Sequence, residues 1–215
     1  MRRSTISRGE WLIPLLLLAG CSSTNYLRDA DPVHSDLTIH VVIENPVGSN
    51  EKWEVLSDGR LVQEYTAEGP VIIPYLPWPA NAGMIPRTLY SAELGGDGEP
   101  LDVLVLGPSI ARGSLVRAVP IGLLQIVDRL ERDDKILAII PGTPLADVED
   151  IADLDARYPG VREILTNWYT NSRPGSAFEV QGFGSRAAAR RLIAAGAREF
   201  DTAEREGSMP TWQTP

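Results

Sequence analysis

The chain has 215 residues, 43% of them hydrophobic, and a mean hydropathy of −0.09, values that fit one globular domain and exclude a largely disordered chain. Its formal net charge of −9 argues against nucleic-acid binding, because phosphate backbones repel an acidic body, and suits binding of divalent cations by carboxylates. One cysteine and two histidines exclude an internal disulfide and argue against a metal site built from cysteine or histidine.

The N-terminus has the layout of a secretory signal peptide, with three arginines in the first eight residues and an apolar run over 11–19. That run is too short to span a bilayer, which takes about 20 apolar residues. It ends in Leu-Ala-Gly-Cys at 18–21, which resembles the bacterial lipobox, so we expect loss of residues 1–20 and a lipid on Cys21. This predicts a membrane-anchored protein of the cell envelope that faces the periplasm, and Ser22 favours the outer membrane. A plain signal peptide with a chance cysteine is the alternative.

Three regions are expected after Cys21. Residues 22–36 are polar and predict a flexible tether, residues 37–203 form the folded domain, and residues 204–215 form a surface tail pinned by Trp212. Without residues 1–20 the chain carries 17 basic and 28 acidic side chains, a net charge of −11.

The first part of the domain, up to about residue 140, consists of short apolar and β-branched runs separated by turn residues. Asp58 and Gly59 mark a hairpin turn, and Pro120 with Gly122 predicts a bend within a longer strand. Several short strands with irregular turns are typical of a small closed barrel. The expected strands are 37–44, 52–56, 61–62, 71–73, 101–106, 114–127 and 135–140.

After Pro141 the apolar residues recur at helical spacing. Ser185 is a suitable N-cap for an alanine-rich helix that reaches about Phe200. The fold class is therefore predicted as α+β, a small closed β-barrel flanked by two or three helices. The expected helices are 145–157, 161–171 and 185–200, with one more strand at 178–182.

One segment gathers three carboxylates within six residues, Asp97, Glu99 and Asp102, at the start of the strand 101–106. Taken alone, Asp-Gly before an apolar run is also typical of an ordinary hairpin turn. Hard divalent cations need oxygen ligands of this kind, and two neighbouring metal ions need carboxylates from several strands.

Two further charged groups could join that segment. Asp133 and Lys135 are two residues apart at the start of a strand, so their side chains share a face, and Asp128 precedes them. Lys52 and Glu54 share a strand face for the same reason. A carboxylate beside a lysine can hold a metal ion and the phosphate that it bridges, although a solvated turn and an exposed ion pair are the alternatives.

In order and spacing, these segments resemble the family I soluble inorganic pyrophosphatases, from about Leu37 to Arg198. The signature of that family, Asp-x-Asp-Pro-x-Asp before apolar residues, resembles the segment from Asp97 to Asp102. Further matching segments are Val42-Ile43-Glu44, Lys52 with Glu54, Trp-Pro-Ala-Asn-Ala-Gly-Met-Ile at 78–85, Asp128 with Asp133 and Lys135, and Tyr169 followed by Val180-Gln181-Gly182-Phe183.

The resemblance implies magnesium-dependent hydrolysis of diphosphate by a metal-activated water, with manganese as a possible substitute. It implies an OB-like barrel and a possible homo-oligomer. The implied magnesium ligands are Asp97, Asp102, Asp128 and Asp133. Glu99 is the implied general base, while Lys52, Lys135 and Tyr169 would hold phosphate oxygens, and Glu44 and Glu54 would support the metal shell.

Four positions depart from the family pattern. Glu99 stands where the family has Asp, and a displacement of about 1 Å at a reacting group can cost on the order of 10²-fold in rate. The others, at positions where the family has an arginine, a tyrosine and a lysine that contact phosphate, are Tyr65, Ala82 and Thr170.

Arg87 or Arg173 is a candidate to replace the missing positive charges. The departures also leave two alternatives to an active pyrophosphatase. One is a non-catalytic lipoprotein that binds metal or a phosphorylated ligand, and the other is a structural lipoprotein of the cell envelope.

Overall fold

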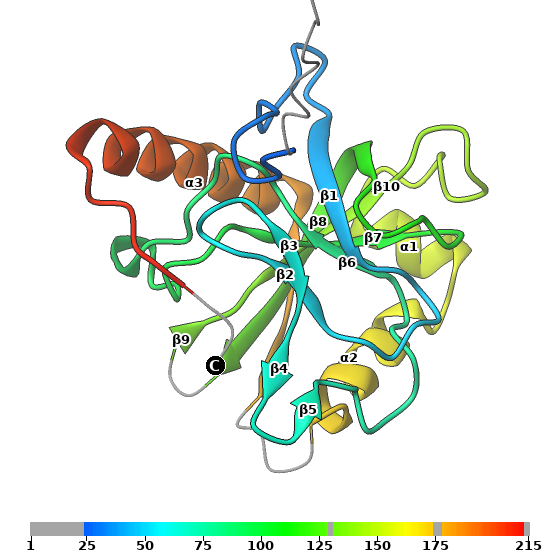
Figure 1. Ribbon diagram of the computed structural model, residues 1–215. Coiled ribbons are helices and arrows are strands. Elements are labelled where there is room, and N and C mark those ends of the chain that lie inside the picture. The colour runs from blue at the N-terminus through cyan, green and yellow to red at the C-terminus, as the bar shows by residue number, and fades with distance from the viewer. Residues whose placement is uncertain (1–23, 129–130, 174–177, 213–215) are drawn as a thin grey trace, which may run out of the picture.

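A computed structural model describes residues 24–128, 131–173 and 178–212. Five strands form a closed ring in the order β1-β6-β7-β10-β8, with β8 returning to β1 (Figure 1). The expected leader and Cys21 lie outside the described residues. The barrel strands are β1 (Ile39–Asn45), β6 (Asn81–Met84), β7 (Asp102–Leu106), β8 (Leu115–Asp128) and β10 (Lys135–Ile139).

The ring closes because β8 is long enough to pair with β1 along its first part and with β10 along its second part. At the predicted bend, Pro120 faces Ala138 and Gly122 faces Leu137, so Ile121 has no partner residue on β10. This irregularity bends the strand around the barrel. The prediction of a closed barrel with three flanking helices is confirmed.

The strand β6 was not among the expected elements, because its sequence Asn-Ala-Gly-Met lacks β-branched residues. Gly83 is required there, since a Cβ at this position would lie 1.9 Å from the Val42 carbonyl oxygen. The expected strand 71–73 is reduced to an isolated bridge between Glu51 and Ile72. The remaining strands are β2 (Trp53–Val55), β3 (Leu61–Gln63), β4 (Tyr65–Thr66), β5 (Gly69–Pro70), β9 (Glu131–Arg132) and β11 (Glu179–Ser185).

Three helices and a 3-10 turn complete the domain. The first helix begins later than expected because Asp150, and not a residue near 145, accepts the capping hydrogen bond from Asp153 N at 2.9 Å. Ser185 caps the last helix as predicted, with Ala188 N donating to its hydroxyl. The elements are η1 (Ala92–Leu94), α1 (Ile151–Arg157), α2 (Val161–Asn171) and α3 (Arg186–Glu206).

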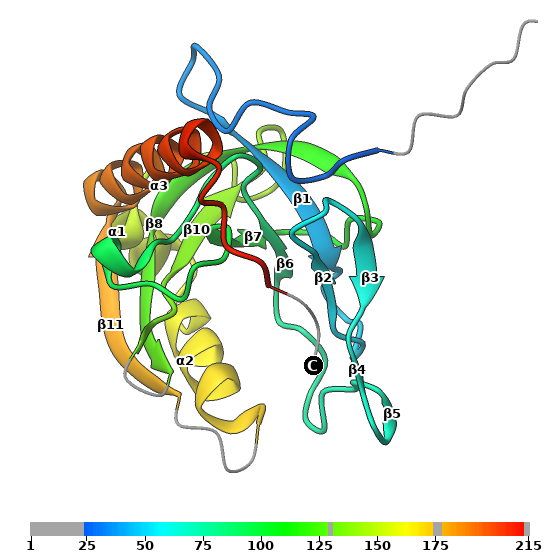
Figure 2. The ribbon, with the colours of Figure 1, turned by 60° about the vertical axis from the view of Figure 1, so that its left-hand side comes forward.

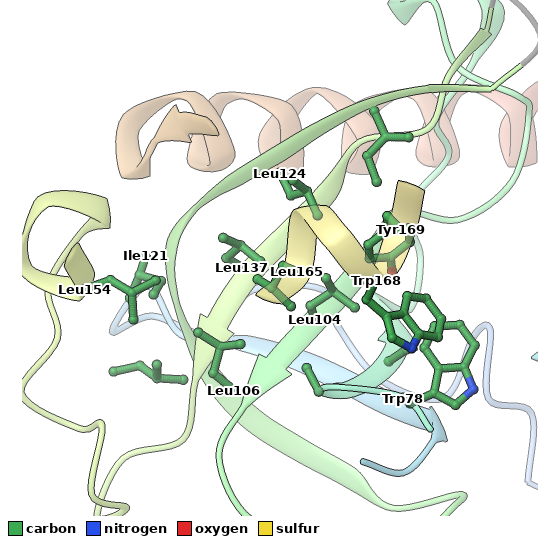
Figure 3. Packing of buried hydrophobic residues seen from close by; sticks show 14 of the residues in the cluster. Trp78, Leu104, Leu106, Ile121, Leu124, Leu137, Leu154, Leu165, Trp168 and Tyr169 are labelled. Carbon is green, nitrogen blue, oxygen red and sulfur yellow. The ribbon is translucent and has the colours of Figure 1, made fainter. Parts of the chain in front are cut away.

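The core between the barrel and α2 sets the position of the functional site. Leu104 and Leu137 from the barrel lie beside Leu165 of α2, and Trp78 and Trp168 close the same cluster (Figure 3). The two indole rings lie 4.5 Å apart between centroids. This packing fixes the C-terminal end of α2, and therefore Tyr169, against the mouth of the barrel.

Residues 24–36 pack on the domain, which corrects the expectation of a flexible tether. Leu27 is fully buried in one cluster with Phe200, and Arg28 pairs with Glu204 at 2.9 Å. The burial of Leu27 contributes about 2 kcal/mol to holding this polar segment on the domain.

The C-terminal tail crosses from α3 to the hairpin β2–β3 (Figure 2). Trp212 is buried, and its indole N–H donates to the Val55 carbonyl oxygen at 2.9 Å. On the way the tail places Pro210 beside Gly98 of the carboxylate-rich loop. Within the described part of the chain, no helix has the length and apolar character needed to cross a membrane.

Candidate active site

A cavity of about 320 Å³ opens at one end of the barrel, and all ten residues singled out from the sequence line it. They arrive from the ends of β1, β2, β7, β8 and β10, from the loop before β7, and from α2. We call its five central carboxylates the acidic cluster, namely Asp97, Glu99, Asp102, Asp128 and Asp133. We call its nitrogen and hydroxyl donors the donor cluster, namely Lys52, Lys135, Tyr169 and Arg173.

Lys135 lies between two members of the acidic cluster. Its buried ammonium group donates to both Asp102 and Asp133. The parallel pairing of β7 with β10 brings these carboxylates together, because Val103 lies opposite Ile136. Among the described residues, no three acidic, histidine or cysteine side chains already form a group that could hold a metal ion. The positive charge between Asp102 and Asp133 is the ammonium group of Lys135.

The donor set nevertheless fits hard divalent cations. Every member of the acidic cluster offers carboxylate oxygens, which are the ligands that magnesium prefers. In addition, Asp128 Oδ1 is buried and has no hydrogen-bond partner among the described residues. A buried carboxylate oxygen without a partner is costly unless a cation or a donor satisfies it.

Burial and mutual repulsion raise the pKa values of the carboxyls in the loop before β7. Burial, followed by the charges of Asp97 and Asp102, raises the pKa of Glu99 to about 8. Burial raises the pKa of Asp97 to about 6, against the hydrogen bond that Glu99 N donates to it at 3.0 Å. Part of each side chain still reaches solvent at the cavity mouth, which screens these charges and reduces the rise in the pKa values. Such crowding of like charges favours a bound cation.

Glu44 lies on β1 and Glu54 on β2, both at the rim of the cavity. Glu44 is buried and accepts a hydrogen bond from Val55 N at 2.7 Å, so it fastens β2 to the end of β1. Burial first, and then the charge of Asp102, raises the pKa of Glu44 well above its ordinary range. Glu54 lies 3.8 Å from Lys52 Nζ.

Lys52 is held by acidic side chains on two strands. Glu64 faces it across the β2–β3 hairpin, where Glu64 N also donates to the Lys52 carbonyl oxygen at 2.9 Å, and the two side chains form an ion pair. Sequence reasoning did not single out Glu64. Its only signal was its position beside Tyr65, where the arginine of the resembled family is absent.

The comparisons with known proteins agree with this geometry. The inorganic pyrophosphatase family model matches residues 41–201, three quarters of the chain. This chain belongs to the inorganic pyrophosphatase family. The family resemblance inferred from the sequence is therefore confirmed, and with it the assignment to hydrolases that cleave phosphoanhydride bonds.

Individual relatives support the assignment. The inorganic pyrophosphatase of Gluconobacter oxydans is 32% identical over 160 residues, which cover 72% of this chain and 87% of that protein. The mouse inorganic pyrophosphatase is 30% identical, but the match covers 64% of this chain and only 54% of that longer protein. The solved pyrophosphatase of Thermus thermophilus has a TM-score of 0.70 at 26% identity, covering 83% of this chain and 99% of that one.

Of the four positions that depart from the family pattern, two line the cavity and two do not. Glu99 and Ala82 line the cavity. Tyr65 and Thr170 are exposed and do not line it. The loss of an aromatic side chain at Ala82 and the change at Glu99 therefore act directly on the shape of the pyrophosphatase cavity.

Of the two arginines proposed to replace the lost charges, only Arg173 lines the cavity. Arg87 lies elsewhere and pairs with Asp201 at 3.3 Å and with Asp31 at 3.6 Å. The expectation for Arg87 was wrong, because Asp201 of α3 and Asp31 hold its side chain outside the cavity.

Sequence reasoning missed several other residues of the site. Asn45 exchanges two hydrogen bonds with the backbone of Trp53, at 2.9 and 2.8 Å, and so holds β2 in place. Its signal was its position directly after Glu44. Further cavity residues that were not predicted are Trp53, Trp78, Glu131, Arg132, Trp168, Ser172 and Phe178.

Proposed function

We propose that this chain hydrolyses inorganic pyrophosphate to two phosphates with magnesium as its cofactor, manganese being a possible substitute. The observation that carries the proposal is the convergence of the acidic cluster and the donor cluster in one cavity from segments far apart in the sequence. A surface turn or an exposed ion-pair edge, the alternatives for each segment alone, does not explain that convergence.

Asp97, Asp102, Asp128 and Asp133 are the residues that would hold magnesium, since their carboxylates share the cavity with the unpaired oxygen of Asp128. Bound there, magnesium would lower the pKa of a water molecule and neutralise phosphate charge. Lys135 can remain between Asp102 and Asp133 or turn toward a phosphate oxygen, because its flexible stem carries three donor hydrogens.

The residues of the chain have distinct roles in the hydrolysis. Lys52, Lys135 and Tyr169 donate to phosphate oxygens and orient the pyrophosphate. The oxygen of water attacks one phosphorus atom, and the bond from that phosphorus to the bridging oxygen breaks. Glu99 takes the proton of the attacking water, since its carboxylate lies in the cavity with Asp97 and Asp102. Glu44 fastens β2 to the end of β1, and both Glu44 and Glu54 would support the residues that hold the metal ions.

Phosphate release from magnesium pyrophosphate by the soluble chain starting at Ser22 tests this proposal. We expect Asp102→Asn to lower the rate by about 10²–10³-fold, the size of losing one preorganised electrostatic contact. The matched control is Asp147→Asn, an exposed residue of the loop before α1, which should keep the rate. No release by the unchanged chain with magnesium or manganese would favour the non-catalytic alternative, a lipoprotein that binds metal or a phosphorylated ligand.

We further propose that Cys21 is lipidated and that the domain works at the periplasmic face of a membrane. Only three positions separate Cys21 from Thr24, and an extended chain of that length spans about 10 Å. Since residues 24–36 pack on the domain, such an anchor would hold the body close to the bilayer. In Figure 1 the dark blue segment 24–36 lies toward the top of the molecule, while β9 and α2 lie toward the bottom. The cavity would then open away from the membrane.

Mass spectrometry of the N-terminal peptide from membranes tests the anchor. A diacylglycerol-modified Cys21 in the intact chain, and release of the Cys21→Ser chain into the soluble fraction, are the expected results. An unmodified cysteine after cleavage would point to a plain signal peptide.

A further inference from the structure

The four nitrogen-bearing cations of the cavity differ in whether their charge is already neutralised. Lys135 pairs with Asp102 and Asp133, and Arg132 pairs with the buried Asp134. Lys52 is also paired, with Glu64 and Glu54. Arg173 forms no ion pair with any residue that the structure describes, although it lines the same cavity.

The position of Arg173 follows from the geometry of α2. The helix ends at Asn171, but its cap residue Ser172 keeps α-helical backbone angles, so Arg173 lies one turn beyond Tyr169 on the same side. Thr170, about 100° further around the helix, is exposed and does not line the cavity. A phosphate-binding side chain on this helix is therefore best placed at 169 or 173.

The charge of Arg173 reaches groups from different elements of the site. Burial raises the pKa of Glu54 on β2, and both Lys52 and Arg173 oppose that rise. Burial also raises the pKa of Asp133 before β10, and Lys135 and Arg173 oppose it. The Arg173 guanidinium itself lies 5.3 Å from the centre of the Phe178 ring, which also lines the cavity. Stacking on an aromatic ring leaves the in-plane N–H donors of a guanidinium available to an anion.

We propose that Arg173 is a further cation that binds the pyrophosphate oxygens in this chain, in addition to Lys52 and Lys135, and that Glu64 limits the affinity by keeping Lys52 engaged in an ion pair. This inference rests on the proposed function for the identity of the ligand. A planar guanidinium binds two phosphate oxygens at once, which the ammonium of Lys52 cannot do while two carboxylates surround it.

Imidodiphosphate is a pyrophosphate analogue with nitrogen in place of the bridging oxygen. Isothermal titration of the soluble chain with imidodiphosphate in the presence of magnesium measures the contribution of Arg173 to binding without turnover. Arg173→Gln should weaken binding about tenfold to a hundredfold, the range for a hydrogen bond to a charged group. Arg173→Lys should recover part of the loss. The matched control is Arg162→Gln on the same helix, whose side chain pairs with Asp155 outside the cavity and should bind as the unchanged chain does.

Glu64→Gln should tighten binding about twofold to fivefold, since it releases Lys52 from a partly exposed ion pair. Unchanged affinity in Arg173→Gln, or no binding by the unchanged chain, would overturn the inference for Arg173. Unchanged or weaker affinity in Glu64→Gln would overturn it for Glu64. The test is separate from hydrolysis, because a chain that binds the analogue through Arg173 but releases no phosphate would contradict only the proposed activity.

Discussion

The acidic cluster and the donor cluster share one cavity but keep the family pattern to different degrees. Four of the five acidic residues match in kind, and Glu99 keeps its charge. On the donor side, Tyr65 and Thr170 stand where the family has cations, and Lys52 is neutralised by Glu64.

Physical chemistry explains why the two clusters tolerate change differently. A hard divalent cation needs several oxygens at short, fixed distances, so each carboxylate must come from one strand end and one register. A phosphate group presents oxygens in several directions, and a cation can reach it from any element around the cavity. The positive charge can therefore move from one element to another, while the carboxylates cannot.

The largest expected change in the free energy of unfolding follows substitution of Asp134, the buried neighbour of Asp133 in the acidic cluster. Asp134 lies between Asp133 and Lys135 but points into the protein, where it accepts from Tyr90 Oη at 3.0 Å and from Ile126 N at 3.1 Å. Asp134→Ala would leave these donors and Arg132 unpaired, at a cost of about 3–5 kcal/mol in the free energy of unfolding. Urea denaturation of the two proteins measures this loss.

Asp133→Asn is the matched comparison, because Asp133 also lies in the two-residue link before β10 but lines the cavity. Lys135 keeps Asp102 as its partner in this variant, so the free energy of unfolding should change much less. Equal losses in the two variants would contradict the assignment of a structural role to Asp134 and of a cavity role to Asp133.

The C-terminal tail supports the donor cluster by packing Trp212 against β2, the strand that directly follows Lys52. Trp212→Ala removes a buried indole and its hydrogen bond to the Val55 carbonyl oxygen, and should cost about 3 kcal/mol, the lower end for a large aromatic side chain. Because Lys52 directly precedes β2 and Glu54 lies on it, the KM for magnesium pyrophosphate should rise more than kcat falls. Trp212→Phe, which keeps most of the packing, should retain most of the stability, and a loss as large as that of alanine would count against packing as the cause.

The acidic cluster should make the metal-free protein less stable as the pH rises. The folded-state pKa of Glu99 is about 8 and that of Asp97 about 6, both above their unfolded values. From about pH 4 to pH 8 the unfolded chain therefore releases protons that the folded chain still holds, so the free energy of unfolding falls as pH rises. Thermal unfolding without metal should show this slope, and Glu99→Gln should reduce it. Excess magnesium should remove the slope, and a slope unaffected by magnesium would argue against metal binding at this cluster.

The smallest change in the free energy of unfolding is expected for a substitution of Glu44. Glu44→Gln keeps an acceptor for Val55 N and removes a buried acidic group beside Asp102, so the free energy of unfolding should change by less than about 1 kcal/mol. Hydrolysis measured beside unfolding separates the two roles. A loss of rate with stability kept would place Glu44 in support of the metal-binding residues, whereas equal rates would restrict it to holding β2.

The sequence by itself determined the barrel, its helices and the acidic cluster. Short β-branched runs, the bend at Pro120 and the cap at Ser185 are local signals, and the structure follows them. Three of the carboxylates lie within six residues, and the resemblance of the whole set to the family pattern assigned them a common site.

Tertiary structure alone decided the rest. The polar composition of residues 24–36 predicts a tether, whereas Leu27 is buried beside Phe200 and holds the segment on the domain. Arg87 pairs with Asp201 and Asp31 outside the cavity. The strand β6 exists because Gly83 can approach Val42, which no propensity shows. The pairing of Lys52 with Glu64, and the position of Arg173 one turn after Tyr169, depend on strand register and on how far a helix continues. Local patterns specify which elements form, whereas the partners of a charged side chain depend on contacts between distant parts of the chain.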